Sequence, residues 1–468
     1  MSKKLFDDFD PVSAKAWKQK IQVDLKGADY NETLIEKTGE GIDVKPFYHA
    51  DDHEDSYLIN QAQDWLVTEK LYLENIEITI ENAKDVIDRG AESLWIIIPE
   101  ANEKKLKFFK ALKDYNIPLY VEFLFSDFDF FQSVDTLLQD QGQTVLVGYD
   151  PIGQLASSGN WFKNQKQDFE VLIKTLELKS FSNTIHIDAR VYQNAGGLII
   201  QQLAYTLAHL NEYLNLLQNS SQKTEPIAVN VIVSQGSNYF FEIAKLKALR
   251  LLVESLAQEL DISIELHIIA EPTKRNQTLY DYNMNMLRST TECMSAILGG
   301  ADWVNNLAYD EIFHKRNEFG ERISRNQLLI LKKESYFDKV SNPVDGTYYI
   351  ESLTKELAEK ALAIFKIIEA GKGFIQQLFE GKIQKKIKES ATKEEEKLIS
   401  GDFTLVGLNK YQNPENKMAQ DLELFPFLKY HQRKTLIEPI LEKRLSESIE
   451  KERLDDEKKN VQPSKENK

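Results

Sequence analysis

Apolar and polar positions form a repeating pattern through the middle of the chain, from about residue 60 to 310. Eight short apolar runs have the length and the β-branched or aromatic content of strands. They occupy residues 65–73, 93–99, 117–125, 144–150, 183–189, 227–235, 262–270 and 302–308. The intervening segments repeat apolar residues at three- and four-residue spacing, as in 197–217 and 238–260, and this spacing predicts helices.

This alternation predicts the architecture of the central region. Eight strands alternating with helices over roughly 250 residues are typical of a (β/α)8 barrel of the TIM type, an α/β fold. Most of the runs are continuously apolar, as parallel strands covered on both faces should be. An open doubly wound sheet is the alternative. The sequence contains neither GxGxxG nor GxxxxGK followed by Ser or Thr, so no phosphate-binding loop of that fold is visible.

The regions that flank the barrel have different patterns. Residues 1–60 have mixed charge and are expected to form an arm, with one amphipathic helix near 13–26. The sequence leaves open whether this arm packs on its own barrel or on a partner, and subunit contact is the role we assign. The barrel is expected over 61–355, and a C-terminal helical extension over 356–445. Residues 446–468 are almost all charged or polar and are expected to be a disordered tail.

Composition and charge restrict the classes of function. The 468-residue chain has a net charge of −16 and a pI near 5.1, and such a surface repels nucleic acids and anionic membranes. No apolar run approaches the ~18 residues of a membrane span, and the first residues lack a secretory pattern, so we expect a cytoplasmic protein. The single cysteine, Cys293, cannot form an internal disulfide and is expected to be a buried apolar residue rather than a nucleophile.

A polar turn after the fifth predicted strand is the most informative candidate site. TIM-barrel enzymes carry their chemistry on loops at the carboxyl ends of the strands. The turn DARVYQNAGG, residues 188–197, offers Asp188, Arg190, Tyr192, Gln193 and Asn194, with Val191 among them. Asp150 and Asp302 are also expected at strand ends on this loop face, either as acids, bases or ligands or as turn caps.

The histidines give weaker indications. His186 and His267 lie inside predicted strands, where each is either a hydrogen-bonded core residue or a group in the barrel lumen. His49 and His53 share an acidic loop that could bind a divalent ion. A solvated loop is the favoured interpretation, and we assign no metal site.

The segment 288–354 combines a helix that ends in Gly-Gly, a short strand, a polar turn and a further helix. Arg322 and Arg325 lie three residues apart on one face of that last helix. Buried ion pairing that ties the helix to the barrel wall is favoured over direct contact with a ligand.

Several long motifs resemble the methylmalonyl-CoA mutase family. The matching stretches are QNAGGLIIQQLAYTLAHLNEYL, YFFEIAKLKALRLL, RSTTECMSAILGG, DEIFHKRNEFGERISRNQLLILKKES and VSNPVDGTYYIESLT. The opening stretch, FDPVSAKAWKQKIQVDLKGADYNETLIEKTGEGIDVKPFY, is similar to the N-terminal arm of the family's small subunit. The resemblance covers most of residues 6–415, with the motifs in the same order and spacing.

The resemblance implies a (β/α)8 barrel that threads acyl-CoA along its axis, followed by a separate cobalamin domain. The family's reaction is the adenosylcobalamin-dependent radical rearrangement of methylmalonyl-CoA to succinyl-CoA, in which the protein supplies binding and orientation. In catalytic members a Tyr-His pair follows the fifth strand. The histidine of that pair hydrogen-bonds the thioester carbonyl of the substrate.

This chain departs from the family pattern at these positions. By the resemblance, the tyrosine and histidine positions fall on Arg190 and Val191, and a valine can neither donate a hydrogen bond nor transfer a proton. A substrate-binding arginine falls on His267, and a glutamine of the last strand's turn falls on Asp302. The stretch VTEKLYLEN replaces the family's Arg-x-Tyr-Ala-Gly-Phe motif after the first strand. We therefore expect degenerate positions here, and assign no catalytic, cofactor-binding or metal-binding residue.

The Asp-x-His-x-x-Gly signature of the cobalamin domain occurs nowhere in the sequence. We therefore expect the non-catalytic small subunit of a heterodimeric mutase, inactive on its own. The expected partner is a large catalytic subunit that binds both adenosylcobalamin and acyl-CoA, and no nucleic acid or membrane is expected as a partner. Two alternatives remain: a substrate-binding barrel whose cobalamin domain is a separate chain, and a chaperone or regulator that docks during cofactor loading.

Overall fold

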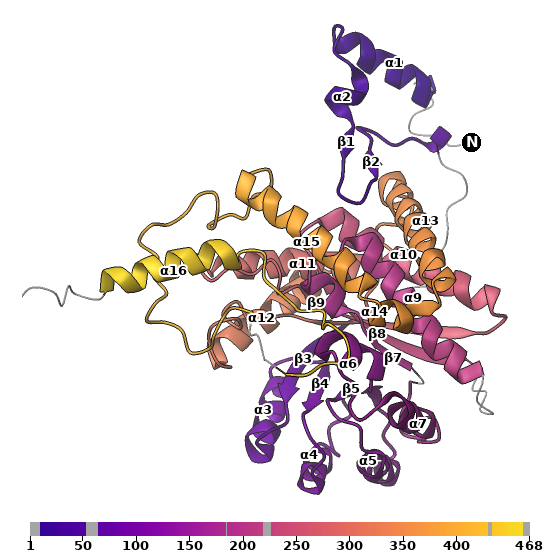
Figure 1. Ribbon diagram of the computed structural model, residues 1–468, viewed down its shortest axis with the longest axis vertical. Coiled ribbons are helices and arrows are strands. Elements are labelled where there is room, and N and C mark those ends of the chain that lie inside the picture. Colours follow the sequence, from indigo (N-terminus) through magenta and orange to yellow (C-terminus); the bar gives the residue numbers. More distant parts are fainter. Residues whose placement is uncertain (1–9, 53–63, 184, 219–225, 429–432, 462–468) are drawn as a thin grey trace, which may run out of the picture.

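A parallel eight-stranded sheet forms the centre of the protein (Figure 1). The computed structural model describes residues 10–52, 64–183, 185–218, 226–428 and 433–461. The strands are β3 (Leu66–Tyr72), β4 (Ser93–Ile98), β5 (Leu119–Phe123), β6 (Leu146–Gly148), β7 (Ile185–Asp188), β8 (Ile227–Gln235), β9 (Ile264–Pro272) and β10 (Trp303–Asn305). Each lies within one of the eight predicted runs or extends it by at most two residues, and their order in the sheet is β6-β5-β4-β3-β10-β9-β8-β7.

The two outermost strands of this order, β6 and β7, lie close to each other. A parallel bridge joins Val145 and Phe181, just before these strands. The Asn183 side chain also donates a hydrogen bond of 2.8 Å to the carbonyl of Val147. The sheet therefore curls into a nearly closed barrel, which confirms the predicted (β/α)8 fold and makes the doubly wound alternative wrong.

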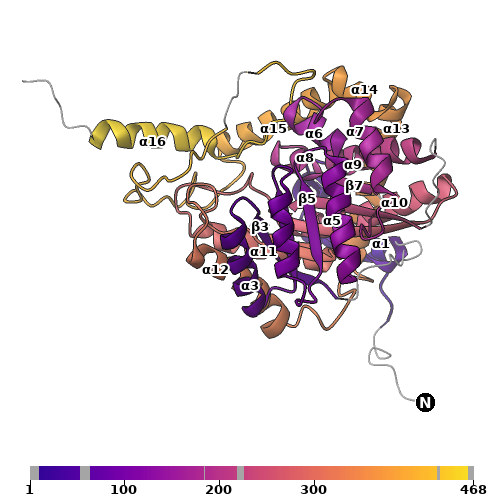
Figure 2. The same cartoon turned by 90° about the horizontal axis from the view of Figure 1, so that it is seen from below.

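Helices cover the outer face of the barrel (Figure 2). They are α3 (Ile76–Asp88), η2 (Glu103–Lys105), α4 (Leu106–Ala111), α5 (Phe128–Gln141), α6 (Pro151–Ser158), α7 (Gln165–Thr175), α8 (Arg190–Asn194), α9 (Ile199–Gln218), α10 (Tyr239–Glu259), α11 (Met284–Gly299), α12 (Glu318–Leu329) and η3 (Ile330–Glu334). Several start at an Asn or Asp whose side chain accepts a hydrogen bond from the first turn, as Asn75, Asp127 and Asn164 do. These Asn and Asp side chains therefore fix where the helices begin after the preceding strands or loops.

The N-terminal arm stands apart from the barrel in Figure 1. It comprises α1 (Ala14–Asp24), α2 (Tyr30–Leu34), a hairpin of β1 (Glu36–Lys37) and β2 (Asp43–Val44), and η1 (Ala50–Asp52). At the hairpin tip, the Glu40 carboxylate accepts hydrogen bonds from the backbone N–H groups of Ile199 and Ile200 at the start of α9. The predicted amphipathic helix is confirmed as α1. None of its residues is buried, so α1 does not pack on its own barrel.

The C-terminal region continues from the barrel without a break. Helix α13 (Tyr348–Ala370) packs on α9 and α10, and α14 (Gly373–Phe379) and α15 (Lys382–Ser400) follow it. The boundary expected between 355 and 356 therefore lies inside α13.

The expectation of a disordered tail is wrong for residues 447–461, which form helix α16 (Glu447–Val461). Leu454 of α16 is buried in a small apolar cluster with Leu279 and Phe313. Glu450 is buried too and lies 2.6 Å from Arg444. These tertiary contacts stabilise a segment whose composition alone is typical of a solvated tail. No helix in the described ranges combines the length and the hydropathy that a membrane crossing requires.

Candidate functional site

Side chains from alternate strand positions fill the lumen of the barrel. Trp95, Tyr120, Ile232, Ile269 and Trp303 form a buried apolar layer, separate from the larger core between the strands and the helices. The rings of Trp95 and Tyr120 meet edge to face, with their centroids 5.3 Å apart. Such layers make the interior of a TIM barrel a packed core rather than a pore. We call these five residues the apolar layer.

Arg190 lies above the apolar layer, at the carboxyl ends of the strands. It is the first residue of α8, directly after β7. Its Nη2 lies 2.7 Å from Asp188 and 3.3 Å from Glu122, and its Nη1 lies 3.1 Å from Glu271. Its guanidinium carbon lies 4.7 Å from the centroid of the Trp95 ring. Burial disfavours the charge, but the three carboxylates raise the pKa of Arg190 above its ordinary value.

Lys70 of β3 approaches Glu271 from the opposite wall of the barrel. Its ammonium lies 2.6 Å from Glu271 and 4.8 Å from the centroid of the Trp95 ring. Burial alone would raise the pKa of Glu271, but Lys70 and Arg190 lower it to about 2. Glu122 behaves differently: burial raises its pKa, and Arg190 only partly offsets this effect. We call Lys70, Glu122, Asp188, Arg190 and Glu271 the ionic layer.

Val191 lines a small cavity of about 110 Å³ beside the ionic layer. Its side chain is buried, with 4% of its surface exposed. Four carboxylates also line this cavity, those of Glu122, Asp150, Asp188 and Glu442. Pockets for small organic ligands usually enclose about 300–1,000 Å³. This cavity is smaller, and its acidic lining disfavours an anionic group.

A wider hollow of about 450 Å³ opens between β3, β10 and α12. Lys70 and Arg190 belong to its lining, together with charged residues of both signs. Lys274 and Glu311 on its wall form an ion pair of 3.1 Å. The cations at its inner end are therefore already neutralised by carboxylates of the chain itself.

A C-terminal segment crosses the loops at the carboxyl face of the barrel. Backbone hydrogen bonds of 2.8–3.1 Å join Ile440 to Ala156, Lys443 to Asn194 and Leu445 to Arg275. The three acceptors follow β6, β7 and β9, respectively. We call residues 436–446 the strap, because they cover part of the mouth of the barrel.

Sequence comparisons place this barrel among known proteins. The family model described as methylmalonyl-CoA mutase matches residues 140–462. The chain is 32% identical over 443 residues to the methylmalonyl-CoA mutase small subunit of Porphyromonas gingivalis, covering 88% of this chain and 71% of that protein. This chain belongs to the methylmalonyl-CoA mutase family. The methylmalonyl-CoA mutases of Cereibacter sphaeroides and Rhizobium meliloti are 35% and 34% identical over 248 and 246 residues. These matches cover 52% and 51% of this chain, and about a third of each of those mutases, 35% and 34%.

The two histidines predicted inside strands of this mutase-family barrel lie in its lumen and are hydrogen-bonded there. Asn230 joins them, because its amide nitrogen lies 3.0 Å from His186 Nδ1 and its amide oxygen lies 3.0 Å from His267 Nδ1. His186 Nε2 also lies 3.1 Å from the hydroxyl of Tyr120. Burial lowers the pKa of His186 to about 4 and also lowers that of His267. Both imidazoles are therefore neutral at pH 7. His53 of the acidic loop lies outside the described residues.

The two aspartates expected on the loop face of the mutase-family barrel, Asp150 and Asp302, lie at opposite ends of the barrel. Asp150 caps α6 by accepting a hydrogen bond from the N–H of Gly153 at 2.8 Å. It also accepts bonds from His209 and Tyr213, so it is a structural cap at the predicted face. The placement of Asp302 is wrong. Asp302 precedes β10, at the opposite, amino end of the barrel, and pairs there with Arg250 at 2.9 Å.

The arginine pair of α12 is divided between two environments. Arg325 is buried and lies 3.1 Å from Glu69 of β3, which confirms the predicted ion pair with the barrel wall. Arg322 is exposed, with its guanidinium carbon 5.6 Å from the Phe319 ring, so buried pairing is wrong for this residue. Cys293 is buried, as predicted, and burial raises the pKa of its thiol.

Lys70, Glu122 and Glu271 were not among the residues predicted from the sequence. A usable signal was present, because Glu122 interrupts an otherwise apolar run and Lys70 follows Glu69 within another, each in the carboxyl half of its run. Charged residues inside a buried strand need partners, and partners at the same level of a barrel come from neighbouring strands. The sequence did not give the distances that join these residues to Arg190.

Proposed function

We propose that this chain is the non-catalytic small subunit of a heterodimeric methylmalonyl-CoA mutase. The adenosylcobalamin-dependent isomerisation of methylmalonyl-CoA to succinyl-CoA would take place on a larger partner subunit that holds both cofactor and substrate. The similarity to a mutase small subunit from Porphyromonas gingivalis supports this assignment. On this proposal the chain is inactive alone and acts by supporting its partner.

The ionic layer is the observation that carries the proposal. Acyl-CoA runs along the barrel axis in catalytic members of the family, by the resemblance described above. In this chain the Arg190 guanidinium occupies the carboxyl end of that axis and pairs with Asp188, Glu122 and Glu271. An acyl group could enter only after these ion pairs break, which would leave buried charges without partners.

The apolar layer supports the same conclusion. Trp95, Tyr120 and Ile232 are fully buried in the lumen, below Arg190. An acyl-CoA chain on the axis would have to displace these side chains. A single small-to-large substitution in a close-packed core typically costs about 1–3 kcal/mol. An acyl-CoA chain is far larger than one side chain, so its insertion would cost more.

The side chain at the family's catalytic position supports an inactive chain. Val191 holds the place of the histidine and offers neither a hydrogen-bond donor nor a titratable proton to a thioester. Four carboxylates line the surrounding cavity of about 110 Å³, beside the side chains of Gln154, Ser157 and His186. Stabilisation of negative charge on a thioester oxygen requires donors, and the four carboxylates act against it by charge repulsion.

The described residues do not fit adenosylcobalamin at the barrel mouth. The strap crosses the loops after β6, β7 and β9, the face that a corrin ring would have to cover. The carboxylates of Glu122, Asp188 and Glu442 next to it are aimed at Arg190 or at the small cavity. We therefore assign the cofactor to the partner subunit.

Calorimetric titration of methylmalonyl-CoA and of CoA into the purified full chain tests the proposal. We expect no saturable heat at millimolar ligand and no succinyl-CoA when adenosylcobalamin is added. A complex purified with a large mutase subunit serves as the positive control. Saturable binding together with turnover by the isolated chain would mean that the barrel is a catalytic subunit with a separate cobalamin protein.

A further inference from the structure

A segment of the C-terminal region, residues 418–428, borders the hollow of about 450 Å³ at the barrel mouth. Figure 1 and Figure 2 both show C-terminal loops beside α12, the helix that follows β10 and its loop. Leu424 of this segment lines the hollow, together with His314 and Lys315 of the loop that precedes α12. We call residues 418–428 the cover and residues 306–317 the rim loop, and both contribute to the wall of the hollow.

The two ends of the cover are bound to α16. Glu457 of α16 accepts hydrogen bonds from the N–H groups of Met418 and Ala419, at 2.9 and 3.1 Å. Glu447 of the same helix accepts one from the N–H of Leu428 at 2.9 Å. The ends are therefore fixed on α16, and the middle of the cover has separate bonds to the barrel.

The middle of the cover binds the rim loop through backbone groups. The carbonyl of Phe313 accepts hydrogen bonds of 2.9 Å from the N–H groups of Glu423 and Leu424. The Glu423 carboxylate accepts a bond of 2.8 Å from the N–H of Lys315. None of these three bonds involves a group that ordinarily changes its charge near pH 7.

His314 adds two contacts of a different kind. Its Nδ1 lies 3.1 Å from Asp310 Oδ2, and its Nε2 lies 3.4 Å from Asp421 Oδ1. Asp310 belongs to the rim loop and Asp421 to the cover, so the imidazole joins the two segments. A neutral imidazole has a single N–H and can donate to only one of these carboxylates. Both bonds together require the charged ring, in which both nitrogens are protonated.

The surroundings of His314 favour this charged ring. Partial burial alone would lower the pKa of His314, but the hydrogen bonds to Asp310 and Asp421 raise it above its ordinary value near 6.5. The charge is therefore complete below about pH 6.5 and is lost as the pH rises through the raised value. None of the other groups here ordinarily titrates between pH 6 and 8.5. They are Tyr309, Glu311, Lys315 and Arg316 on the rim loop, Glu423 on the cover, Glu321 on α12, and Arg453 and Glu457 on α16.

We propose that protonated His314 holds the cover closed over the hollow and that neutral His314 lets the middle of the cover open. Loss of the ring proton removes at least one of the two bonds to aspartate. The ends of the cover stay on α16, and the bonds to Phe313 can re-form, so the middle opens more often rather than permanently. The hollow thus becomes more accessible at alkaline pH. This device acts within the chain and does not depend on the proposed function.

Hydrogen exchange of the full chain, followed by mass spectrometry at pH 6 and pH 8.5, tests the proposal. The N–H groups of Glu423 and Leu424 report opening of the cover, because both are bound to Phe313 in the closed form. After correction for the intrinsic exchange rate, their protection in the wild type should fall about three- to tenfold between the two pH values. A peptide from β8 should show no such fall, which separates local opening from global unfolding.

Two substitutions decide whether His314 causes this fall. His314→Gln is never charged, so its protection should be as low at pH 6 as that of the wild type at pH 8.5. His314→Lys stays charged, so at pH 8.5 it should keep the protection that the wild type has at pH 6. An equal fall in wild type and His314→Gln, or equal protection of the two variants at pH 8.5, would overturn the proposal.

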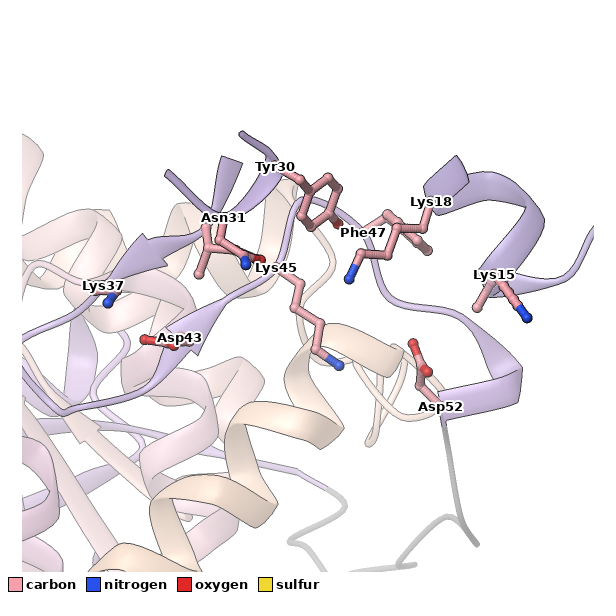
Figure 3. A pocket seen from close by; sticks show the side chains of 11 residues that line it. Lys15, Lys18, Tyr30, Asn31, Lys37, Asp43, Lys45, Phe47 and Asp52 are labelled. Carbon is pink, nitrogen blue, oxygen red and sulfur yellow. The ribbon is translucent and has the colours of Figure 1, made fainter. Parts of the chain in front are cut away.

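His49→Gln is the matched control, because His49 also lies near an aspartate, 3.5 Å from Asp51. Phe47 and Asp52, on either side of His49 in the sequence, line a separate groove of about 610 Å³ in the N-terminal arm (Figure 3). This control should show the same fall in protection of the cover as the wild type. A smaller fall, equal to that of His314→Gln, would also overturn the proposal, since the effect would then not be specific to His314.

Discussion

Arg190 and Asp188 are two residues apart in the chain and form an ion pair inside the barrel, with Nη2 2.7 Å from Oδ2. Asp188 ends β7 and Arg190 begins α8, in the stretch where the resemblance places the Tyr-His pair of catalytic members. In this chain the guanidinium of Arg190 points into the lumen, where it forms two further ion pairs, with Glu122 and Glu271. Arg190 thus pairs with three carboxylates in the barrel interior.

Replacing Arg190 by methionine should destabilise the fold strongly. Arg190→Met keeps an unbranched side chain but leaves Asp188 and Glu122 without their main counter-charge, and leaves Glu271 with Lys70 alone. Breaking a buried ion pair by removing one partner costs about 3–5 kcal/mol. Urea unfolding at pH 7 measures the change. Arg322→Met is the control, because Arg322 is exposed, and its effect should stay within about 0.5 kcal/mol. Equal stabilities of the two variants would show that the ionic layer does not hold the barrel together.

Trp95→Ala should lower stability without creating a binding site for acyl-CoA. Trp95 is fully buried in the apolar layer and lies beneath both Lys70 and Arg190. Its truncation should cost about 3–5 kcal/mol, whereas Trp17→Ala on the exposed helix α1 should cost less than about 1 kcal/mol. Unfolding by denaturant measures the loss of stability, and calorimetric titration of CoA into Trp95→Ala measures whether a binding site has formed. Tight CoA binding by Trp95→Ala would indicate that a single side chain closes the axis.

The eight strands could be predicted from the sequence because parallel strands buried on both faces produce continuous apolar runs. Arg190 and Val191 were found for a similar reason, since they sit in a polar turn directly after such a run. The ionic layer could not be predicted, because Lys70, Glu122 and Glu271 come from three strands whose alignment depends on the closed barrel. Asp302 was predicted at the wrong end of the barrel. It is the first residue of the predicted run 302–308 and directly precedes β10, so it lies at the amino end of that strand.

Helix α16 could not be predicted from its own sequence, because contacts with distant residues stabilise it. Its sequence is dominated by charge, and its burial rests on Leu454 and on the Arg444–Glu450 ion pair of 2.6 Å. Arg444 lies outside the helix, so no pattern within residues 447–461 reveals this contact.

Stability should depend on His186 in the mildly acidic range. Burial lowers the pKa of His186 to about 4, below the ordinary value near 6.5 that applies to the unfolded chain. Between these values the unfolded state binds the extra proton, so stability falls as the pH drops from about 6.5 to about 4. The loss is on the order of 3 kcal/mol. His186→Gln should weaken this dependence and leave the part due to His267, whose pKa burial also lowers, and urea unfolding at pH 7, 5.5 and 4.5 measures the change. Parallel pH profiles of wild type and variant would contradict the assignment of a neutral, buried imidazole.

The lowered pKa of Glu271 acts in a different range. Its folded-state value of about 2 lies below the ordinary 4.5, so its contribution is present above pH 4.5 and is lost as the pH falls towards 2. The profile of His186→Gln should therefore keep its decline below about pH 4.

Val191→His should not make the chain a mutase. The new imidazole would enter a cavity of about 110 Å³, while the Arg190 guanidinium still occupies the axis. The added volume should lower stability by about 1–3 kcal/mol, and Val191→Leu serves as an apolar control of similar size. Conversion of methylmalonyl-CoA in the presence of adenosylcobalamin is the readout. Any turnover by Val191→His alone would contradict the proposed non-catalytic role.

Purification of the tagged full chain from its own cells, with identification and stoichiometry of the copurifying proteins, tests the proposed small-subunit role. We expect a larger mutase subunit in a one-to-one ratio, with cobalamin bound to that partner. Recovery of a separate small cobalamin protein, in a complex that turns over acyl-CoA without any large subunit, would contradict it. The turn at Arg190 and Val191 would then belong to a working active site.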